Sequence, residues 1–213
     1  MTKTLSHADL MDRTYRYQRL IYDITRRYYL LGRDRLLLDL DPPKGARVLE
    51  VACGTGRNLA RVRALYPDCA LFGLDISDEM LRSARGKLGL HAQLVQADAS
   101  SFDGAALFGA EGFDRVLLSY SLSMIPEWEA ALRLAAAQLR PGGSLHVVDF
   151  GDQADLPRWF QRLLRRWLAR FHVTPRSDLE GKLQEVATSL NATLTFRYHY
   201  RRYAQLAVLT RPG

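Results

Sequence analysis

Five short apolar runs, separated by segments with helical periodicity, dominate the chain between Arg47 and Phe150. The runs cover residues 47–51, 70–75, 92–98, 113–121 and 144–150. Helical patterns lie between them at 58–65, 78–88 and 128–139. Strands that alternate with helices form right-handed βαβ units, which build a parallel sheet covered by helices on both faces. The pattern therefore predicts an α/β fold with a mostly parallel sheet.

The N-terminal part of the chain is expected to form a helical lid ahead of this core. Residues 9–38 are rich in Tyr and Arg and have a helical pattern that is broken near Gly32. The stretch Asp41–Gly45, with two prolines and a glycine, predicts a loop. We therefore divide the chain into a lid, residues 1–41, and a core domain, residues 42–213.

The C-terminal part adds a helix and a hairpin to the core. Residues 177–190 predict a helix opened by a capping box, in which Ser177 and Glu180 bond reciprocally to the first backbone N–H groups. Two apolar stretches then flank Arg201 and Arg202. This arrangement predicts an antiparallel hairpin that closes the edge of the sheet.

Composition excludes several classes of protein. The chain has 213 residues, 47% apolar and 25% charged, as expected of a globular domain. It has no apolar run near the roughly 20 residues of a membrane-spanning helix, and its N-terminus lacks the apolar segment of a signal peptide. Cys53 and Cys69 have no metal-binding spacing, so we expect a cytoplasmic protein without a metal site. Of the net charge of +7, six charges belong to residues 151–213.

A glycine turn after the first strand predicts a nucleoside ligand. Gly54 and Gly56 follow that strand, in which Glu50 lies, and Asp75 and Asp98 end the second and third strands. Ligands of open α/β sheets bind outside the carboxyl ends of the strands, where these residues gather. A carboxylate at position 75 can accept both ribose hydroxyls, and one at position 98 can accept from an adenine ring.

The predicted ligand is S-adenosylmethionine rather than a dinucleotide. Leu59 occupies the place of the third glycine in the dinucleotide fingerprint, and the sequence contains no P-loop motif. Glu50 beside the turn would repel a phosphate and favour a cation. S-adenosylmethionine combines a nucleoside with a sulfonium and an ammonium group, so it satisfies each of these features.

Five motifs, in order, resemble those of the class I, seven-stranded S-adenosylmethionine-dependent methyltransferases. They are VLEVACGTGRN, GLDISDEML, QADASSF, FDRVLLSYSLSMI and LRPGGSLHVVDF. The resemblance implies a Rossmann-like sheet of seven strands with a C-terminal antiparallel hairpin. The family usually has glycine where this chain has Ala52, which puts that backbone contact in question.

The same resemblance implies which residues hold the cofactor. Glu50 and the 52–56 turn would approach the methionine part and Asp75 the ribose. Asp98 and Ala99 would approach the adenine. The full expected set is Tyr22, Arg26, Glu50, Ala52, Cys53, Gly54, Thr55, Gly56, Asn58, Asp75, Ile76, Met80, Asp98, Ala99 and Ser119. Within it, Ile76 and Met80 would flank the adenine, and Ser119 would lie on the sulfonium side.

Tyrosines are the expected catalytic residues. Tyr15 and Tyr22 lie seven residues apart, so they share a helix face, and Tyr120 lies at the end of the fourth predicted strand. An aromatic face stabilises a methylated ammonium by about 0.5–2 kcal/mol. Methyl transfer depends mainly on alignment, and an amine with a pKa of about 8 needs no strong general base. The alternative is that the tyrosines pack on the core; His146, inside the fifth strand, is expected to be structural.

A basic amphipathic helix is predicted at residues 156–171. Its apolar residues recur with helical spacing, and the face opposite holds five arginines and no acid. This composition is typical of a helix that lies in the interface of an anionic membrane. An ordinary helix packed on the sheet is the alternative. The arginines are Arg158, Arg162, Arg165, Arg166 and Arg170.

The chain as a whole resembles the bacterial diacylglyceryl-homoserine N-methyltransferases of betaine-lipid synthesis. The resemblance rests on YRYQRLIYDITRRYYLLGRDRLL, DFGDQADLPRWF and FHVTPRSDLEGKL. It implies repeated methylation of a lipid amine by a cytoplasmic enzyme peripheral to the membrane. The acceptor's carboxylate would need an arginine, for which Arg26, Arg176 and Arg201 are candidates.

Other acceptors and roles stay open. The core motifs suit a methyltransferase of a small soluble amine, another phospholipid amine or a quinone equally well. A nucleic-acid methyltransferase is disfavoured, because SYSLSM replaces the usual Asn-Pro-Pro-Tyr-like motif after the fourth strand. A non-catalytic cofactor-binding subunit is disfavoured by the intact turn and acids. The oligomeric state is left open.

Overall fold

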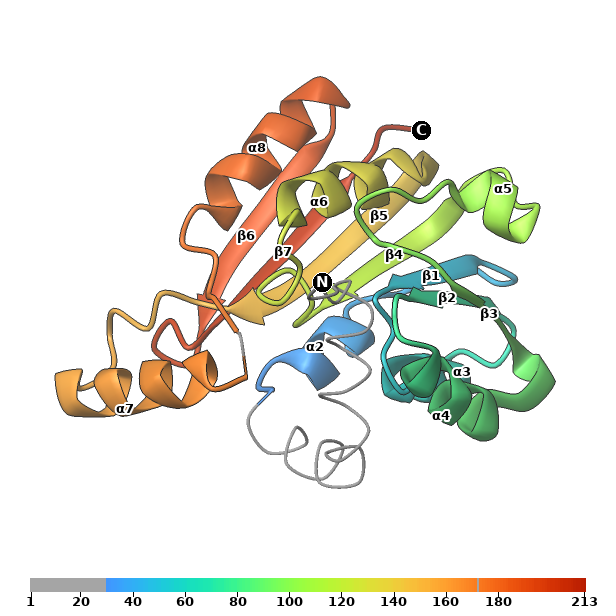
Figure 1. Ribbon diagram of the computed structural model, residues 1–213. Coiled ribbons are helices and arrows are strands. Elements are labelled where there is room, and N and C mark those ends of the chain that lie inside the picture. The colour runs from blue at the N-terminus through green and yellow to red at the C-terminus, as the bar shows by residue number, and fades with distance from the viewer. Residues whose placement is uncertain (1–29, 172) are drawn as a thin grey trace, which may run out of the picture.

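The computed structural model describes residues 30–171 and 173–213 as one α/β layer structure (Figure 1). Seven strands form a single sheet in the order β3-β2-β1-β4-β5-β7-β6. The strands are β1 (Arg47–Val51), β2 (Ala70–Asp75), β3 (Ala92–Gln96), β4 (Phe113–Ser119), β5 (Leu139–Phe150), β6 (Thr193–His199) and β7 (Ala204–Thr210). The helices are α2 (Arg33–Leu38), α3 (Arg57–Leu65), α4 (Asp78–Leu88), α5 (Gly104–Phe108), α6 (Trp128–Ala137), α7 (Arg158–Ala169) and α8 (Leu179–Ser189), with a 3-10 turn η1 (Gly89–His91).

The predicted α/β fold class is confirmed. Strands β3, β2, β1, β4 and β5 pair in parallel, whereas β7 pairs antiparallel with both β5 and β6. The predicted antiparallel hairpin at the edge of the sheet is therefore confirmed. Its second strand, β7, is inserted between β5 and β6, and β6 forms the edge.

Each face of the sheet has its own apolar core. On one face, Leu49, Val51 and Leu145 pack with residues of α5, α6 and α8. On the other face, Val48 and Val148 pack with residues of α2, α3, α4 and α7. This division follows from the alternation of side chains along a strand, and Figure 1 shows the two helical layers on opposite sides of the sheet.

The segment around α2 is part of the second core. Leu36, Leu37 and Leu40 are buried, and the hydroxyl of Tyr66 donates to the carbonyl of Leu37 at 3.1 Å. Gly32, where the sequence predicted a break, is the N-cap of α2 with φ of 87°. Residues 30–41 thus pack on the sheet, while the rest of the predicted lid lies outside the described residues.

Several predicted boundaries change. Helix α8 begins at Leu179 with Asp178 as its N-cap and no side-chain capping bond, so the capping box of Ser177 and Glu180 is wrong. The Arg-Pro-Gly-Gly stretch after α6 belongs to β5, which begins at Leu139 rather than Ser144. Helix α5 was not predicted, because its five residues are too few for a periodic pattern.

Candidate active site

The glycine turn lies at the carboxyl end of β1, which pairs with β2 and with the central strand β4. Its backbone is left-handed at Ala52, Gly54 and Gly56, with φ of 57°, 55° and 71°. A Cβ added at Gly54 would meet nothing within 4 Å, so this position leaves space for a ligand. A Cβ at Gly56 would lie 2.9 Å from the side chains of Ala84 and Leu88. The second glycine therefore allows α3 to pack against α4, and the first allows a ligand to approach.

Ala52 adopts a conformation that L-residues rarely take. A left-handed backbone costs a residue with a Cβ about 1–2 kcal/mol, which explains why the family prefers glycine here. This backbone strain is located in the candidate site, because Ala52 lines the cavity there. Ala52 thus adopts the left-handed conformation in which glycine is favoured, and it adds a methyl group to the cavity lining.

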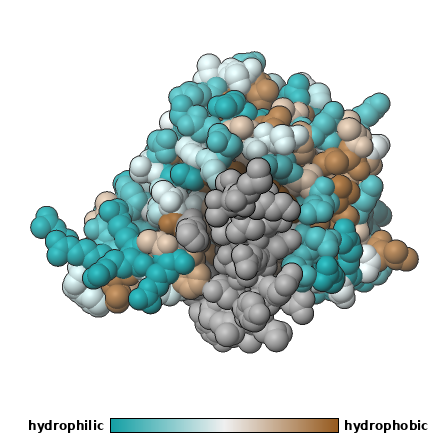
Figure 2. Space-filling model, in the orientation of Figure 1, coloured by the Kyte–Doolittle hydropathy of each residue, from teal (hydrophilic) through white to brown (hydrophobic). Residues whose placement is uncertain are grey.

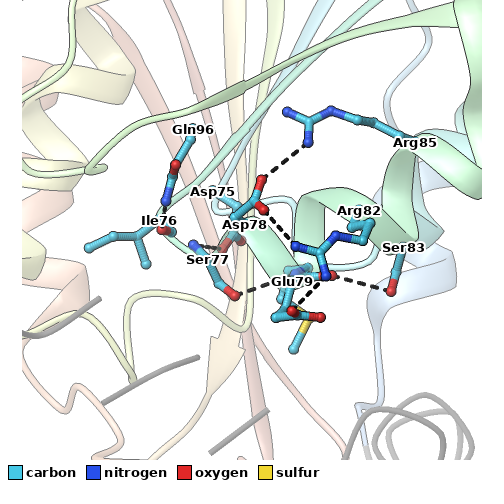
Figure 3. Close-up of polar contacts among 10 residues, drawn as sticks. Asp75, Ile76, Ser77, Asp78, Glu79, Arg82, Ser83, Arg85 and Gln96 are labelled. Atoms are coloured by element: carbon cyan, nitrogen blue, oxygen red, sulfur yellow. Dashed lines mark hydrogen bonds and ion pairs between the residues drawn. The ribbon is translucent and has the colours of Figure 1, made fainter. Parts of the chain in front are cut away.

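Asp75 ties the turn to the end of β2. Its Oδ2 accepts from the backbone N–H of Gly54 at 2.8 Å. Its Oδ1 accepts from the backbone N–H of Ser77 at 2.9 Å (Figure 3). The side chain is buried. Each carboxylate oxygen has a second lone pair, so an oriented Asp75 can accept further hydrogen bonds from a ligand. The contact of Asp75 with a ribose stays a prediction.

A cavity of about 240 Å³ continues from Asp75 along the ends of β2 and β3. Ile76, Asp98 and Ala99 line it, as expected for an adenine site. Asp98 is fixed by bonds from the backbone N–H and hydroxyl of Ser100, at 2.8 and 2.7 Å. The wall formed by Ile125, Pro126 and Glu127 was missed by the sequence analysis. These residues follow β4, and their place at the carboxyl end of a parallel strand could have indicated that they line the site.

Glu50 is buried beneath the turn and is poorly compensated. Its Oε1 accepts from the side-chain amide of Asn58 at 2.6 Å, whereas its Oε2 is buried without a hydrogen-bond partner among the described residues. Burial raises its pKa from 4.5 to about 8, against the lowering effects of Asn58 and Arg33. A cationic ligand beside Glu50 would supply the missing partner.

The remaining expected cofactor residues take different positions. Cys53 and Thr55 lie within the turn and are buried. Met80 is buried at the start of α4, where its N–H bonds the hydroxyl of the N-cap Ser77 at 3.3 Å, and it does not line the 240 Å³ cavity. Ser119 ends β4, and its hydroxyl is buried without a partner among the described residues.

Tyr120 has a structural position that does not suit the expected catalytic role. It is 1% exposed, its ring packs edge-on against Phe150 at 4.7 Å, and its hydroxyl donates to the carbonyl of Leu31. Burial raises the pKa of this hydroxyl well above its usual value. Tyr120 therefore anchors the segment before α2. Tyr15, Tyr22 and Arg26 lie outside the described residues.

Neither described candidate for the acceptor's carboxylate is placed to serve. The guanidinium of Arg176 donates to the carbonyls of Leu122 and Ile125, at 3.1 and 2.9 Å, and lies 5.5 Å from the ring centroid of Trp128. It therefore holds the loop after β4. Arg201 is exposed at the β6–β7 turn.

His146 is structural, as expected. It is buried in β5, bonds the hydroxyl of Ser144 at 2.9 Å, and burial lowers its pKa to about 4. Among residues 30–171 and 173–213, no cluster of His, Cys, Asp and Glu could hold a metal ion. Within the same residues, no helix is both long and apolar enough to cross a membrane.

Helix α7 divides its apolar residues between the core and the surface. Leu164 and Leu168 are buried, and Phe160 and Trp167 pack partly against the second core. Trp159 and Leu163, by contrast, are 69% and 60% exposed. The helix therefore packs on the protein through Phe160, Leu164, Trp167 and Leu168. Trp159 and Leu163 remain exposed to solvent beside the arginines. In Figure 1 it projects at the edge of the molecule, away from α3 and α4.

Residues 48–143 match the methyltransferase domain family. Demethylmenaquinone methyltransferase of Staphylococcus aureus is 30% identical over 145 residues, which cover 67% of this chain and 58% of the relative. The chain therefore spans less than two thirds of the length of the curated relatives it matches. The strand order and the glycine turn followed by Asp75 agree with this family match, and together they show the Rossmann-like fold of the class I S-adenosylmethionine-dependent methyltransferases.

Solved structures share this fold across the whole chain. A chain of the complex between the Haloferax volcanii Trm112 methyltransferase activator and its methyltransferase superposes with a TM-score of 0.72, at 17% identity, over 98% of both chains. Phosphoethanolamine N-methyltransferase 2 of Haemonchus contortus, bound to S-adenosylhomocysteine, superposes with a TM-score of 0.73 at 15% identity. That match covers 100% of this chain and 62% of the other. These similarities confirm the fold.

Proposed function

We propose that this protein transfers methyl groups from S-adenosylmethionine to the amine of a membrane-lipid head group. Diacylglyceryl-homoserine, which would become the trimethylated betaine lipid, is the first acceptor to test. The protein would act from the cytoplasm, at the inner face of the membrane. One observation carries the proposal: α7 presents Trp159 and Leu163 to solvent within a row of arginines that contains no acid.

The charge of α7 is available to an anionic surface. Among the described residues, none of its arginines forms an ion pair, and Arg165 alone has a bond, from its guanidinium to the carbonyl of Asp152 at 2.9 Å. Each cation near an anionic membrane contributes about 1 kcal/mol of attraction. The left end of Figure 2, where α7 lies, is accordingly rich in hydrophilic residues with hydrophobic ones among them.

The apolar part of α7 distinguishes a membrane from a nucleic acid. A phosphate-tracking surface needs cations and polar groups, whereas an interfacial helix also inserts large apolar side chains into the head-group region. Trp159 could stack on an unpaired base, but the aliphatic Leu163 beside it suits the apolar part of a membrane interface better. The contact of Trp159 with Phe160, 5.7 Å between ring centroids, orients the indole on this exposed side.

The chemistry asks little of the protein beyond alignment. S-adenosylmethionine supplies a methyl group on a sulfonium that is ready for displacement. Asp75 and the 52–56 turn would orient the nucleoside, and Glu50 would face the cationic methionine end. A neutral amine held in line with the methyl group then reacts without a strong general base. This agrees with the position of Tyr120, whose hydroxyl donates to the carbonyl of Leu31 and is therefore not available as a base.

Mass spectrometry of lipid products tests the proposal. The full chain, S-adenosylmethionine and vesicles containing one amine lipid at a time should give products heavier by successive methyl groups. We expect diacylglyceryl-homoserine to be methylated faster than phosphatidylethanolamine, and soluble homoserine to react slowest. Methylation of the soluble amine alone would contradict the lipid assignment and leave the methyltransferase assignment in place.

A quinone is the second candidate acceptor. The similarity to demethylmenaquinone methyltransferase favours it, and a quinone is also reached from the membrane surface. Adding a demethylated menaquinone to the vesicle panel separates the two candidates. Its methylation, with every amine lipid inert, would favour the quinone.

A further inference from the structure

A cavity of about 420 Å³ lies on the sheet face that carries α2, at the strands of the C-terminal hairpin. Residues of β5, β6 and β7 form its floor, and α2 forms one wall. The volume lies in the range of small-molecule sites, about 300–1,000 Å³. The cavity shares no residue with the 240 Å³ cavity, nor with a cavity of about 590 Å³ that Arg57 and Arg61 line beside the glycine turn. It is therefore a separate candidate site.

Strand register brings side chains of β5, β6 and β7 together in this cavity. Thr195, Arg197 and His199 alternate along β6, so they share one face of the sheet. The other residues of β6 face α8, which lies along this strand on the opposite side (Figure 1). Val208 of β7 is in register with Thr195 on one side and with His146 of β5 on the other. His146 is thus the inner end of a row of side chains that reaches the edge strand.

The imidazole of His146 lines this cavity and has one nitrogen without a partner. Its Nε2 bonds the hydroxyl of Ser144 at 2.9 Å, whereas its buried Nδ1 has no hydrogen-bond partner among the described residues. The side chain is 3% exposed, and burial lowers its pKa to about 4, so it is neutral at pH 7. A buried polar atom without a partner costs about 1–3 kcal/mol. A ligand in the cavity would supply the partner.

Arg197 gives the cavity an unbalanced positive charge. Its side chain is exposed on the edge strand and forms no ion pair or hydrogen bond with a described residue. Arg35, the other arginine of the lining, pairs with Asp39 at 2.8 Å. Since Asp39 is the one acid of the lining, its charge is balanced by Arg35, and that of Arg197 is left over. The cavity therefore favours an anion.

Apolar side chains form the rest of the lining. Leu206 and Val208 of β7 are partly buried, and Leu36 of α2 is buried. The start of α2 packs closely here, because a Cβ added at Gly32 would lie 3.0 Å from the side chain of Leu206 and 3.7 Å from that of Tyr200. The N-terminal end of α2 therefore covers part of the floor. An apolar group on this floor would be shielded from water.

We infer that this cavity binds a small amphiphilic oxyanion, a carboxylate or a phosphate on a short apolar body. The oxyanion accepts from the guanidinium of Arg197 and from Nδ1–H of His146, the tautomer in which Nε2 accepts from Ser144. The apolar body lies on Leu206. The ligand has two possible sources, a single-chain lipid of the membrane and a soluble metabolite of the same chemistry. The inference does not depend on the methyl acceptor, because the cavity lies outside the cofactor site.

Calorimetry and thermal melting of the full chain test this inference. The probes are octyl phosphate, inorganic phosphate, octanol and octyltrimethylammonium, which separate the contribution of charge from that of apolar area. Octyl phosphate should saturate the site and raise the melting temperature, whereas the other three should bind at least about tenfold more weakly. Arg197→Gln should weaken octyl phosphate binding about tenfold, because a charged donor is lost. Arg201→Gln is the matched control, since Arg201 is exposed on the same hairpin and outside the cavity.

NMR of histidine-labelled protein gives a second readout. Octyl phosphate should shift the Nδ1 resonance of His146, which is assigned by its loss in His146→Gln. Arg197→Gln should reduce this shift at the same probe concentration. The inference is overturned if Arg197→Gln binds octyl phosphate as the wild type does, if Arg201→Gln loses as much affinity, if octyltrimethylammonium binds equally well, or if the His146 resonance does not move.

Vesicles separate the two sources of the ligand. If the membrane supplies it, phosphatidylcholine vesicles with lysophosphatidate should bind the wild type more tightly than Arg197→Gln, since α7 is the same in both proteins. If the ligand is soluble, both proteins should bind these vesicles equally, and the difference for octyl phosphate should remain. A failure to methylate any lipid would leave both results standing.

Discussion

The side-chain amide of Asn58 donates to one oxygen of Glu50 at 2.6 Å, and the other oxygen of this buried carboxyl has no partner among the described residues. Burial therefore holds the pKa of Glu50 at about 8. The cofactor site thus contains an acid that is protonated at neutral pH until a cation arrives. Two consequences follow, one for binding and one for stability.

Cofactor affinity should rise with pH. Below pH 8 the free protein holds a proton on Glu50, and binding the cationic ligand releases it. The dissociation constant for S-adenosylmethionine should fall by up to about tenfold per unit between pH 6 and pH 7.5. Calorimetry in buffers of different ionisation enthalpy would detect the released proton. Glu50→Gln should remove this pH dependence, and a pH dependence that survives the substitution would contradict the assignment.

Glu50→Gln should also stabilise the cofactor-free protein at pH 7. The unfolded carboxyl ionises near pH 4.5, whereas the folded one keeps its proton to about pH 8. Between these values the folded state binds more protons, so wild-type stability falls as pH rises, by about 1.4 kcal/mol per unit at most. Glu50→Gln has no carboxyl to ionise at this position, so its stability should not fall in this way as pH rises. The difference in the free energy of unfolding between the variant and the wild type should vanish near pH 4. Chemical denaturation at pH 4 and pH 7 measures it.

Asp75→Ala should weaken S-adenosylmethionine binding by about 1.5–3 kcal/mol, because ribose hydroxyls lose a charged acceptor. The structure adds a second effect: the N–H groups of Gly54 and Ser77 lose their acceptor, so the melting temperature should also fall. Asp78→Ala is the control, since the side chain of Asp78 is half-exposed and pairs with Arg82 and Arg85 (Figure 3). Unchanged affinity in Asp75→Ala would remove the ribose assignment.

The two glycines of the turn should respond differently to alanine. Both glycines have a left-handed backbone, so alanine at either position costs about 1–2 kcal/mol in backbone strain. At Gly54 the new methyl group enters open space, so this strain is the main stability cost and cofactor affinity should fall. At Gly56 the methyl group would also overlap Ala84 and Leu88, so stability should fall further, by about 1–3 kcal/mol. Melting curves and calorimetry on both variants test the distinction. Equal stability losses with equal affinity losses would contradict it.

Trp159 and Trp167 form a matched pair on α7. Trp159 is exposed, so Trp159→Ala should weaken binding to anionic vesicles at high salt, where attraction by charge is screened, and leave the melting temperature unchanged. Trp167 packs partly against the core and stacks edge-on with Phe171 at 5.1 Å, so Trp167→Ala should lower the melting temperature. Vesicle binding that is insensitive to Trp159→Ala would argue that α7 only covers the protein.

Local patterns predicted most of the sheet and the cofactor turn. The runs around Glu50 and Asp75 identify buried strands whose carboxyl ends carry the site, because strand and turn signals act over a few residues. The insertion of β7 beside β5 depends on pairing between distant segments, so the sequence could not reveal it. The same applies to Arg176, whose bonds to Leu122 and Ile125 join segments more than 50 residues apart.

The roles of glycine and arginine were also beyond local patterns. The motif predicted that Gly56 approaches a ligand. In the structure Gly56 lies so close to Ala84 and Leu88 that a Cβ would not fit, so its role is in the packing of α3 on α4. The sequence analysis assigned no role to Arg57 or Arg61, because the cavity that they line forms only when α2 packs on α3. The division of α7 into a packed half and an open half likewise required the tertiary structure.

Methyl transfer to vesicle lipid, compared between the wild type and an α7 variant, tests the central claim most directly. Arg158, Arg162 and Arg166 would be changed together to Gln; Arg165 is kept because it bonds Asp152. We predict that this variant binds anionic vesicles about 3 kcal/mol more weakly than the wild type. Transfer of labelled methyl groups to diacylglyceryl-homoserine in those vesicles should therefore fall. Transfer to a short-chain soluble analogue should be unchanged. Equal activity of both proteins on vesicle lipid, or equal loss on both acceptors, would contradict the claim that α7 brings this methyltransferase to a membrane acceptor.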